Sequence, residues 1–313
     1  MDASFSSAPP EVLICEVGPR DGLQSLTRLL PTPDKLRWID ALHAAGLRHV
    51  EVGSFMPARR VPGMADVAEV VRHALGRPGL ELTALVPNGR GAQAALDCGV
   101  HRLSLPLSAS SAHSLASVRK TPLQMIQELR LIAQLRDEVA PQVRIEAGIS
   151  DAFGCPLDGP VDAGEVMRLA VLAAAAGADE VGLADTAGQA EPAQVHRLFA
   201  RLRREIGAHM GSAHLHDTRG QGLANCRAAH DAGVRRFDSS LGGLGGCPYA
   251  PGTSGNLLTE DLVVLFASLG VRTGIDLPRL LDARALLGRG LADPPPAGTA
   301  PADPGPPPGL LPA

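Results

Sequence analysis

Two histidines separated by one residue, His214 and His216, stand in a short apolar run that predicts a β-strand. Residues i and i+2 of a strand project from the same face, so both imidazoles are expected to point at one place. Two converging imidazoles are a common start of a metal site. Burying both rings without partners would be costly. The less favoured alternative is a pair of core histidines that are satisfied by hydrogen bonds.

A site built on two imidazoles needs an anionic ligand. Asp21 is the best-placed carboxylate because it directly follows the first predicted strand, and Asn256, in the segment PGTSGNL, could add a neutral oxygen. Mixed nitrogen and oxygen ligation with open positions suits Mg²⁺, Mn²⁺, Co²⁺ or Zn²⁺ acting as a Lewis acid. The residues therefore predict a divalent-metal site and leave the identity of the ion open.

Three more charged residues lie within or just after predicted strands. Arg20 precedes Asp21, Glu51 interrupts an apolar run, and Asp185 follows another such run. Arg20 could pair with Glu51 as scaffolding, or its charge could stabilise an oxyanion on a substrate. Glu51 and Asp185 face the same choice between ion pairing and proton transfer.

A glycine-rich run at residues 242–246 leads into Cys247. The run has more glycine than a tight turn needs, which predicts a mobile loop that carries a thiol over the site. Such a thiol could exchange a proton in the closed state, although a free cysteine is more often inert. The run lacks the spacing and following helix of a dinucleotide fingerprint.

The elements that must position these residues alternate along the chain. Strands are predicted at residues 12–17, 49–55, 82–86, 102–107, 143–149, 180–183, 212–216 and 236–241. Helices are predicted at residues 33–45, 65–74, 91–98, 122–139, 162–176, 192–206, 221–232 and 259–269. One unit (helix end, glycine turn, buried strand) recurs in AAGLRHVEV, DCGVHRLSL, AAGADEVGL and DAGVRRFDSS. Eight such units in ~260 residues favour a (β/α)8 TIM barrel over a doubly wound open sheet.

In a TIM barrel the chemistry lies at the carboxyl ends of the strands, and polar residues recur there along this chain. We expect a flexible N-terminus over residues 1–11, one catalytic barrel over residues 12–290, and a disordered tail over residues 291–313. The tail is predicted to be disordered because 9 of its last 21 residues are proline, and such a segment cannot bury apolar area.

Composition excludes several classes of protein. The net charge of −4 and the 3% of aromatic residues argue against a nucleic-acid or acidic-membrane partner. No apolar run approaches the ~20 residues that span a bilayer. The start, MDASFSSAPP, does not read as a secretory signal, and five scattered cysteines make no disulfide framework. We expect a cytoplasmic protein.

Together these residues resemble the metal-dependent barrel lyases and Claisen-type synthases, and among them the 3-hydroxy-3-methylglutaryl-CoA (HMG-CoA) lyases. The similarity covers residues 12–290 in the family order. It rests on the phrases EVGPRDGLQ, VEVGSF, VPGMAD, FGCP, ADTAG, HLHDTRGQGLAN and DSSLGGLGGCPYAPGTSGNLLTED. The segment GLGGCPYA points to the lyase branch.

The resemblance implies a role for each matching residue. The divalent-cation ligands of the family correspond to Asp21, His214, His216 and Asn256. Arg20 matches the arginine beside the thioester oxygen, and Cys247 matches the loop cysteine that would protonate the enolate carbon. Glu51, Asp185 or a metal-linked histidine could act as the base. Expected substrate contacts at the strand ends are Arg20, Gln24, Ser54, Asn88 and Ser108.

The implied reaction is retro-Claisen cleavage of a 3-hydroxyacyl-CoA, with HMG-CoA giving acetyl-CoA and acetoacetate. The chain departs from the family at Ser25 and Leu26, at Ser111, and at Asp151, where the usual residue is uncharged. None of these positions is a metal ligand or Arg20, so the reaction class is unaffected. The departures leave open which acyl group the substrate carries, for example a citramalyl group. A Claisen-type synthase and a non-catalytic barrel are the alternatives. We expect an acyl-CoA as the small-molecule partner and a homodimer.

Overall fold

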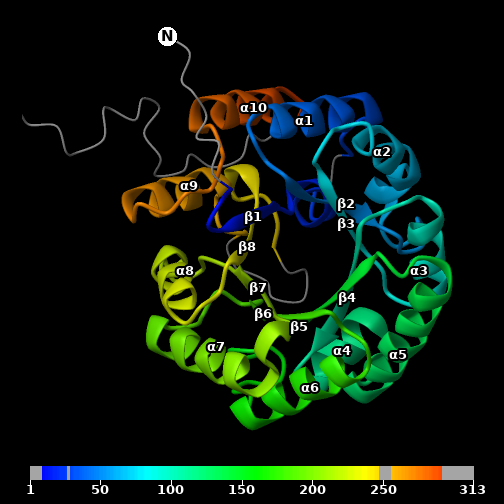
Figure 1. Cartoon of the computed structure of the whole chain (residues 1–313), viewed down its shortest axis with the longest axis vertical. Helices are drawn as coiled ribbons and strands as arrows, with labels where there is room; N and C mark the ends of the chain where they lie inside the picture. Colours follow the sequence, from blue (N-terminus) through cyan, green and yellow to red (C-terminus); the bar gives the residue numbers. More distant parts are fainter. Residues whose placement is uncertain (1–8, 27–28, 247–254, 291–313) are drawn as a thin grey trace, which may run out of the picture.

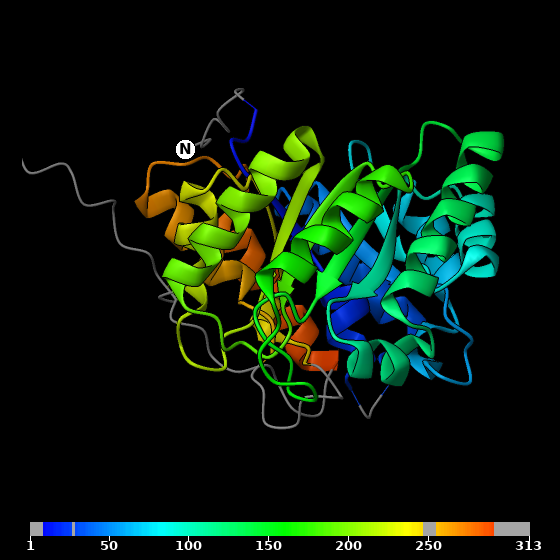
Figure 2. The same ribbon diagram turned by 90° about the horizontal axis from the view of Figure 1, so that it is seen from below.

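The structure, a computed structural model, describes residues 9–26, 29–246 and 255–290. Its eight strands form a closed parallel barrel in chain order, and the pairing of β8 with β1 closes the ring. The helices lie around the outside of the barrel, and the strands run in one direction (Figures 1 and 2). The predicted (β/α)8 barrel is confirmed, and an open sheet is excluded.

The strands are β1 (Leu13–Glu16), β2 (His49–Ser54), β3 (Glu81–Leu85), β4 (Arg102–Ser108), β5 (Arg144–Ser150), β6 (Glu180–Asp185), β7 (Met210–Leu215) and β8 (Arg236–Ser239). The α-helices are α1 (Thr32–Ala44), α2 (Val67–Ala74), α3 (Gly89–Asp97), α4 (Ser111–Val118), α5 (Pro122–Val139), α6 (Ala163–Ala175), α7 (Pro192–Ile206), α8 (Gly222–Asp231), α9 (Thr259–Ser268) and α10 (Leu277–Gly290). Short helical turns are η1 (Gly18–Gly22), η2 (Pro62–Met64), η3 (Gly207–His209) and η4 (Leu241–Gly243).

Every predicted strand and helix is present, with ends that differ by at most two residues. Two helices lie outside the predictions. α4 begins where the Ser110 hydroxyl accepts the His113 N–H at 3.0 Å, and its serine-rich sequence gives no clear apolar period. α10 packs against α1 and α9 on the outside of the barrel (Figure 1). None of the described helices is long and apolar enough to cross a membrane.

The barrel interior is built in layers, as expected when alternate strands contribute inward side chains. The first residues of the even-numbered strands are His49, Arg102, Glu180 and Arg236. Arg102 is 1% exposed and contacts Glu180, whose Oε2 lies 2.9 Å from Arg236 Nη1. Arg236 in turn lies 3.1 Å from His49 Nδ1. This paired layer fills the amino end of the barrel with charged groups.

Two residues further along the same strands, the residues line the wall of a cavity. These positions are Glu51, Ser104, Gly182 and Asp238. The next inward position of an odd-numbered strand is His214 on β7, paired in register with Asp238 of β8. Because every second side chain of a strand points inward, the same strands contribute to the charged layer at the amino end and to the cavity at the carboxyl end.

Candidate active site

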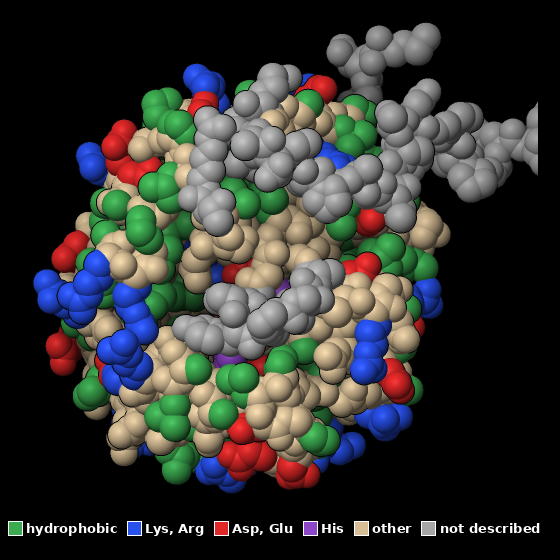
Figure 3. Space-filling view, turned by 180° about the vertical axis from the view of Figure 1, so that it is seen from behind, with side chains coloured by type: hydrophobic (Ala, Val, Ile, Leu, Met, Phe, Trp, Pro, Cys, Tyr) green, Lys and Arg blue, Asp and Glu red, His purple; other side chains and the backbone are tan. Residues whose placement is uncertain are grey.

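A cavity of about 730 Å³ opens at the carboxyl ends of the strands. Several of the predicted site residues line it: Arg20, Asp21, Gln24, Glu51, Ser108, His214 and His216. In Figure 3, which shows one face of the molecule, histidine side chains are visible in a hollow near the centre. The cavity therefore collects residues that are distant in sequence.

Arg20 and Asp21 lie on η1, a π-helical turn directly after β1. A Cβ at Gly18 would lie 2.4 Å from Glu16 Oε1 and 2.8 Å from Trp38, so the turn requires a glycine there. Single π-helical turns often occur at functional sites because they redirect side chains. This turn places Asp21 above the barrel interior.

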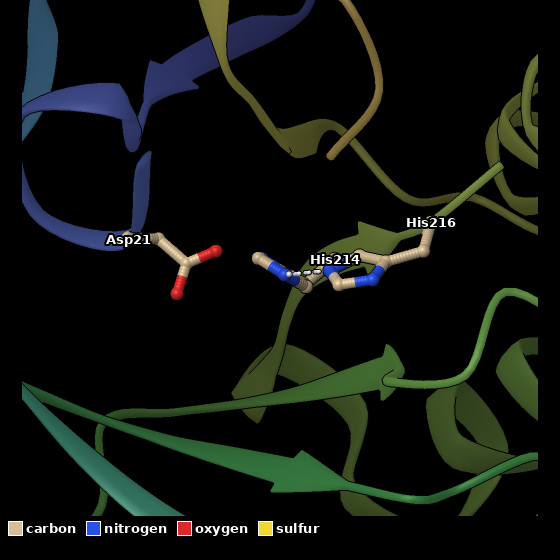
Figure 4. A group of neighbouring side chains, drawn as sticks. All are labelled: Asp21, His214 and His216. Carbon is tan, nitrogen blue, oxygen red and sulfur yellow. Dashed lines mark hydrogen bonds between the residues drawn. The ribbon is translucent and has the colours of Figure 1, made fainter. Parts of the chain in front are cut away.

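Asp21, His214 and His216 form a three-residue cluster (Figure 4). One ligand atom of each residue lies within 4.8 Å of those of the other two. The Nε2 atoms of the histidines are 3.2 Å apart, and the Asp21 carboxylate faces His214. Asn256 is brought beside them by a bridge with His216, and its Nδ2 donates to Asp21 Oδ2 at 2.7 Å.

The glycine run permits this close approach. A Cβ at Gly245 would lie 2.2 Å from Asn256 Nδ2 and 3.0 Å from Asp21 Oδ2. Gly245 also has φ +125°, a conformation that other residues rarely adopt. The glycine is therefore required for packing against the cluster.

The charges favour the ligand forms of two of the three residues, Asp21 and His216. Burial opposes ionisation of Asp21, but Arg20 and His214 outweigh it and lower the pKa of the carboxyl. Burial, with His214 nearby, lowers the pKa of His216 to about 4, so its ring is neutral near pH 7. A carboxylate and imidazole nitrogens that converge in this way fit a divalent cation. Asn256 Oδ1 has no hydrogen-bond partner among the described residues.

Asp238 supports the cluster, and sequence reasoning missed it. Its Oδ2 lies 3.2 Å from His214 Nδ1, the arrangement that fixes a ligating imidazole with Nε2 toward the metal. Burial opposes protonation of His214, but the hydrogen bond and charge of Asp238 raise the pKa of the ring. The signal was a charged residue within the eighth predicted strand.

Arg20 links the cluster to Glu51. Its Nη1 lies 2.7 Å from Asp21 Oδ1 and its Nε lies 2.7 Å from Glu51 Oε2. Burial raises the pKa of Glu51 to about 7, although Arg20 opposes that shift. The Glu51 Oε1 atom has no hydrogen-bond partner among the described residues. The predicted ion pair between Arg20 and Glu51 is therefore confirmed. Because Arg20 also lines the cavity, its stabilisation of an oxyanion on a substrate stays a prediction.

Other predicted residues are not brought to this cavity. Asp185 turns its carboxylate to the loop after β6, where it accepts the Gln189 and Ala190 N–H groups at 3.1 and 2.9 Å. Ser54 is buried and accepts the Met56 N–H at 3.3 Å. Cys247 lies outside the described residues, as does the predicted tail over residues 291–313.

Asn88 lies elsewhere. Its Oδ1 caps α3 by accepting the Gly91 N–H at 3.0 Å, and the residue lines a second, smaller cavity. If Asn88 contacts substrate as predicted, the contact lies in this second cavity and not in the cavity that holds the metal cluster.

Two further groups went unnoticed in the sequence. Glu16 joins η1, η4 and α9, because its carboxylate accepts the Gly18 and Leu241 N–H groups and the Thr259 hydroxyl. Burial raises the pKa of Glu16 to about 8. His113 lines the active-site cavity, and its Nδ1 lies 2.9 Å from Asp151 Oδ2, which also accepts the Ser108 hydroxyl at 2.7 Å. The sequence shows Asp151 as a departure from the family pattern, but it does not predict that His113 on α4 is its partner.

Comparison with known proteins shows close relatives. A family model described as HMGL-like matches residues 11–287. The chain is 38% identical to the hydroxymethylglutaryl-CoA lyase YngG of Bacillus subtilis over 275 residues, which is 88% of this chain and 91% of the relative. It is 40% identical to the (R)-citramalyl-CoA lyase of Chloroflexus aurantiacus over 298 residues, 91% of this chain and 93% of the relative.

A solved structure has the same fold. An HMG-CoA lyase from Acenitobacter baumannii, in complex with coenzyme A and 3-methylmalate, superposes with a TM-score of 0.84 at 37% identity. The match covers 91% of this chain and 93% of that one.

Proposed function

The chain belongs to the HMGL-like family, and from this membership we propose that it cleaves HMG-CoA to acetyl-CoA and acetoacetate with a divalent cation. The observation that carries the proposal is the cluster of Asp21, His214 and His216 beside Arg20 in one cavity. The reaction class is a carbon–carbon lyase.

The ion would be held by Asp21, His214 and His216, with Asn256 as a further oxygen ligand. When bound, a divalent cation lowers the pKa of the substrate hydroxyl and fixes its orientation. Arg20 stabilises the negative charge that develops on the thioester oxygen as the C–C bond breaks. We propose Mg²⁺ or Mn²⁺, because the set includes oxygen ligands as well as imidazoles.

Two proton transfers complete the step. A base takes the proton of the C3 hydroxyl, C3 becomes a ketone, and the bonding electrons pass to the acetyl-CoA enolate. Cys247, matching the family cysteine, would then protonate the enolate carbon. We assign the base to Glu51, because it lines the cavity, whereas both oxygens of Asp185 accept backbone N–H groups.

Replacing Glu51 by glutamine is expected to slow kcat on the order of 10²-fold, the usual contribution of a positioned base. In the wild type, kcat/KM should rise with pH through about 7, since the pKa of Glu51 is about 7 and the base acts when ionised. The amide oxygen of glutamine can still accept from Arg20, so the variant should lose the pH dependence and keep the Arg20 position. Measured pH–rate profiles at saturating Mn²⁺ test this.

Because imidazole ligands also titrate, Mn²⁺ affinity must be measured at each pH for both proteins. An unchanged profile in Glu51→Gln would remove Glu51 from the role of base and leave it as a partner of Arg20.

The proposed activity is tested by incubating the protein with HMG-CoA and Mg²⁺ or Mn²⁺ and identifying products by mass spectrometry. Acetyl-CoA and acetoacetate are expected, and EDTA should stop their formation. Citramalyl-CoA is the second candidate substrate, supported by the 40% identical citramalyl-CoA lyase, and its cleavage would give acetyl-CoA and pyruvate. Turnover that survives chelation, or no cleavage of either thioester, would contradict the proposal.

Other features are proposed on the same basis. The division into an N-terminus, a barrel over residues 12–290 and a proline-rich tail follows the sequence pattern. The resemblance to the family supports an acyl-CoA as partner and a homodimer, and the composition supports a cytoplasmic protein with no nucleic acid or membrane as partner.

A further inference from the structure

The active-site cavity continues below the metal cluster into the interior of the barrel. Its wall includes His214 and, two residues nearer the amino end of β7, Ser212. A strand rises ~3.3 Å per residue, so the cavity reaches ~7 Å deeper than His214. We call this deeper part the inner chamber. Residues of β3 to β7 line it: Thr83, Ser104, Pro106, Glu146, Gly148, Gly182, Ala184 and Ser212.

The inner chamber exists because the side chains that could fill it are small. The interior of a TIM barrel is ordinarily filled by layers of bulky branched side chains. Here the middle positions are Pro106, Gly148 and Ala184, and Pro106 pairs in register with Gly148. All three are partly exposed although they lie on strands of the closed barrel. Because they also line the cavity, that exposure is to the inner chamber.

Gly148 is the clearest sign that this space is kept open. A Cβ added to Gly148 would have no atom within 4 Å, whereas one added to Gly182 would lie 2.8 Å from Ser212 Oγ. Gly148 is also not among the glycines with positive φ. Glycine inside a strand is unfavourable compared with residues that have a side chain. Neither backbone conformation nor packing requires glycine here, so the residue is explained by the space that it leaves.

The lower end of the inner chamber is polar and its charge is already balanced. Thr83, Ser104 and Ser212 bring hydroxyl groups to it, beside the Glu146 carboxylate. Glu146 Oε2 lies 3.7 Å from Arg102 Nη2 and 3.9 Å from Arg236 Nη2. A further charge buried here would lack a counter-ion, whereas an uncharged donor or acceptor can bond to the hydroxyl groups.

An unsatisfied polar atom is an independent sign that a ligand occupies this region. Glu51, the register partner of Thr83, lines the same cavity and is 3% exposed. Its Oε1 has no hydrogen-bond partner among the described residues. Buried polar atoms are nearly always hydrogen-bonded, so a ligand is expected beside this wall.

We propose that the inner chamber receives a substituent on C3 of the acyl group that is longer than methyl and ends in an uncharged hydrogen-bonding group. The inference rests on the proposed function and names the class of 3-hydroxyacyl-CoA that this site takes. With the C3 hydroxyl at the metal cluster, the substituent continues past His214 into the barrel. Its first carbons contact Pro106, Gly148 and Ala184, and its polar end reaches the hydroxyl groups below them.

The test compares three thioesters that differ only at C3. HMG-CoA carries a methyl group there, and two analogues carry a butyl or a 4-hydroxybutyl group instead. Release of acetyl-CoA is the common measurement. We expect the wild type to cleave the 4-hydroxybutyl thioester with a kcat/KM at least equal to that for HMG-CoA. The butyl thioester should be about tenfold poorer than the 4-hydroxybutyl thioester, because it leaves the hydroxyl groups of the chamber unpaired.

Two kinds of variant separate the size of the chamber from its polarity. Gly148→Ala and Gly148→Val narrow it in steps, so the ratio of kcat/KM for the 4-hydroxybutyl thioester to that for HMG-CoA should fall progressively, by at least about tenfold with valine. The melting temperature should not fall, because the added Cβ has free space and valine favours strands. Ser104→Ala keeps the space and should reduce the preference for 4-hydroxybutyl over butyl about fivefold.

Three outcomes would overturn the proposal. A wild type that cleaves HMG-CoA and neither longer thioester would show that the chamber does not admit substrate. Equal losses for all three thioesters in Gly148→Val would make Gly148 a structural residue. Equal cleavage of the butyl and 4-hydroxybutyl thioesters would remove the polar end from the assignment.

If the wild type cleaves none of the three thioesters, the proposed function fails separately. Calorimetric binding of the intact thioesters in the presence of Mn²⁺ then decides the chamber assignment by itself. The assignment holds if Gly148→Val weakens binding of the 4-hydroxybutyl thioester more than binding of HMG-CoA, and it fails if both change equally.

Discussion

Replacing His216 by alanine is expected to reduce metal-dependent turnover to background. The variant removes one of three groups whose ligand atoms lie within 4.8 Å of one another, and the remaining His214 and Asp21 come from different strand ends. A catalytic ion with few protein ligands depends on each of them for affinity and for orientation of the substrate. Mn²⁺ titration followed by calorimetry, with activity at each concentration, measures both losses.

His209→Ala is the matched control. His209 lies in η3 before β7, at the opposite end of the strand that leads to His216, and its Nδ1 contacts only backbone carbonyl oxygens in the described structure. The control should retain activity and Mn²⁺ affinity. If His216→Ala bound Mn²⁺ as tightly as the wild type, the cluster would not be the metal site.

The metal cluster was predictable because it follows from the alternation of side chains along a strand and from the common rim of a barrel. A strand places i and i+2 on one face, so His214 and His216 could be paired from their spacing alone. Asp21 followed from the barrel, since strand ends meet at one rim. The helix ends were predictable for the same reason, because glycines such as Gly46 and Gly177 adopt positive φ just past α1 and α6.

What the sequence could not reveal depends on registers between distant strands. Asp238 meets His214 only because β7 and β8 pair in that register. Asp185 falls near a strand end, as expected, but backbone N–H groups of its own loop hold the carboxylate away from the cavity. His113 reaches Asp151 only through α4, a helix without a clear apolar period. Local patterns predicted which residues reach the rim, and cross-strand packing decided where their side chains turn.

Replacing Arg20 by methionine is expected to lower kcat on the order of 10³-fold, the loss seen when a preorganised oxyanion partner is removed. Binding of the CoA thioester should stay measurable, because methionine fills a similar volume. Steady-state kinetics with HMG-CoA, together with calorimetric binding of free CoA, measure the two effects. A nearly normal kcat would count against the assignment.

Arg20 also holds two carboxylates, so its loss has a second consequence that must be separated from the first. Without it, Asp21 and Glu51 lose the charge that lowers the pKa of each, and Mn²⁺ affinity could change. Arg20→Lys keeps the charge but cannot bond both carboxylates as a fork. If Arg20 acts on the thioester oxygen, the lysine variant should recover Mn²⁺ affinity fully and kcat only in part. Equal recovery of both would show that Arg20 serves only to position Asp21 and Glu51.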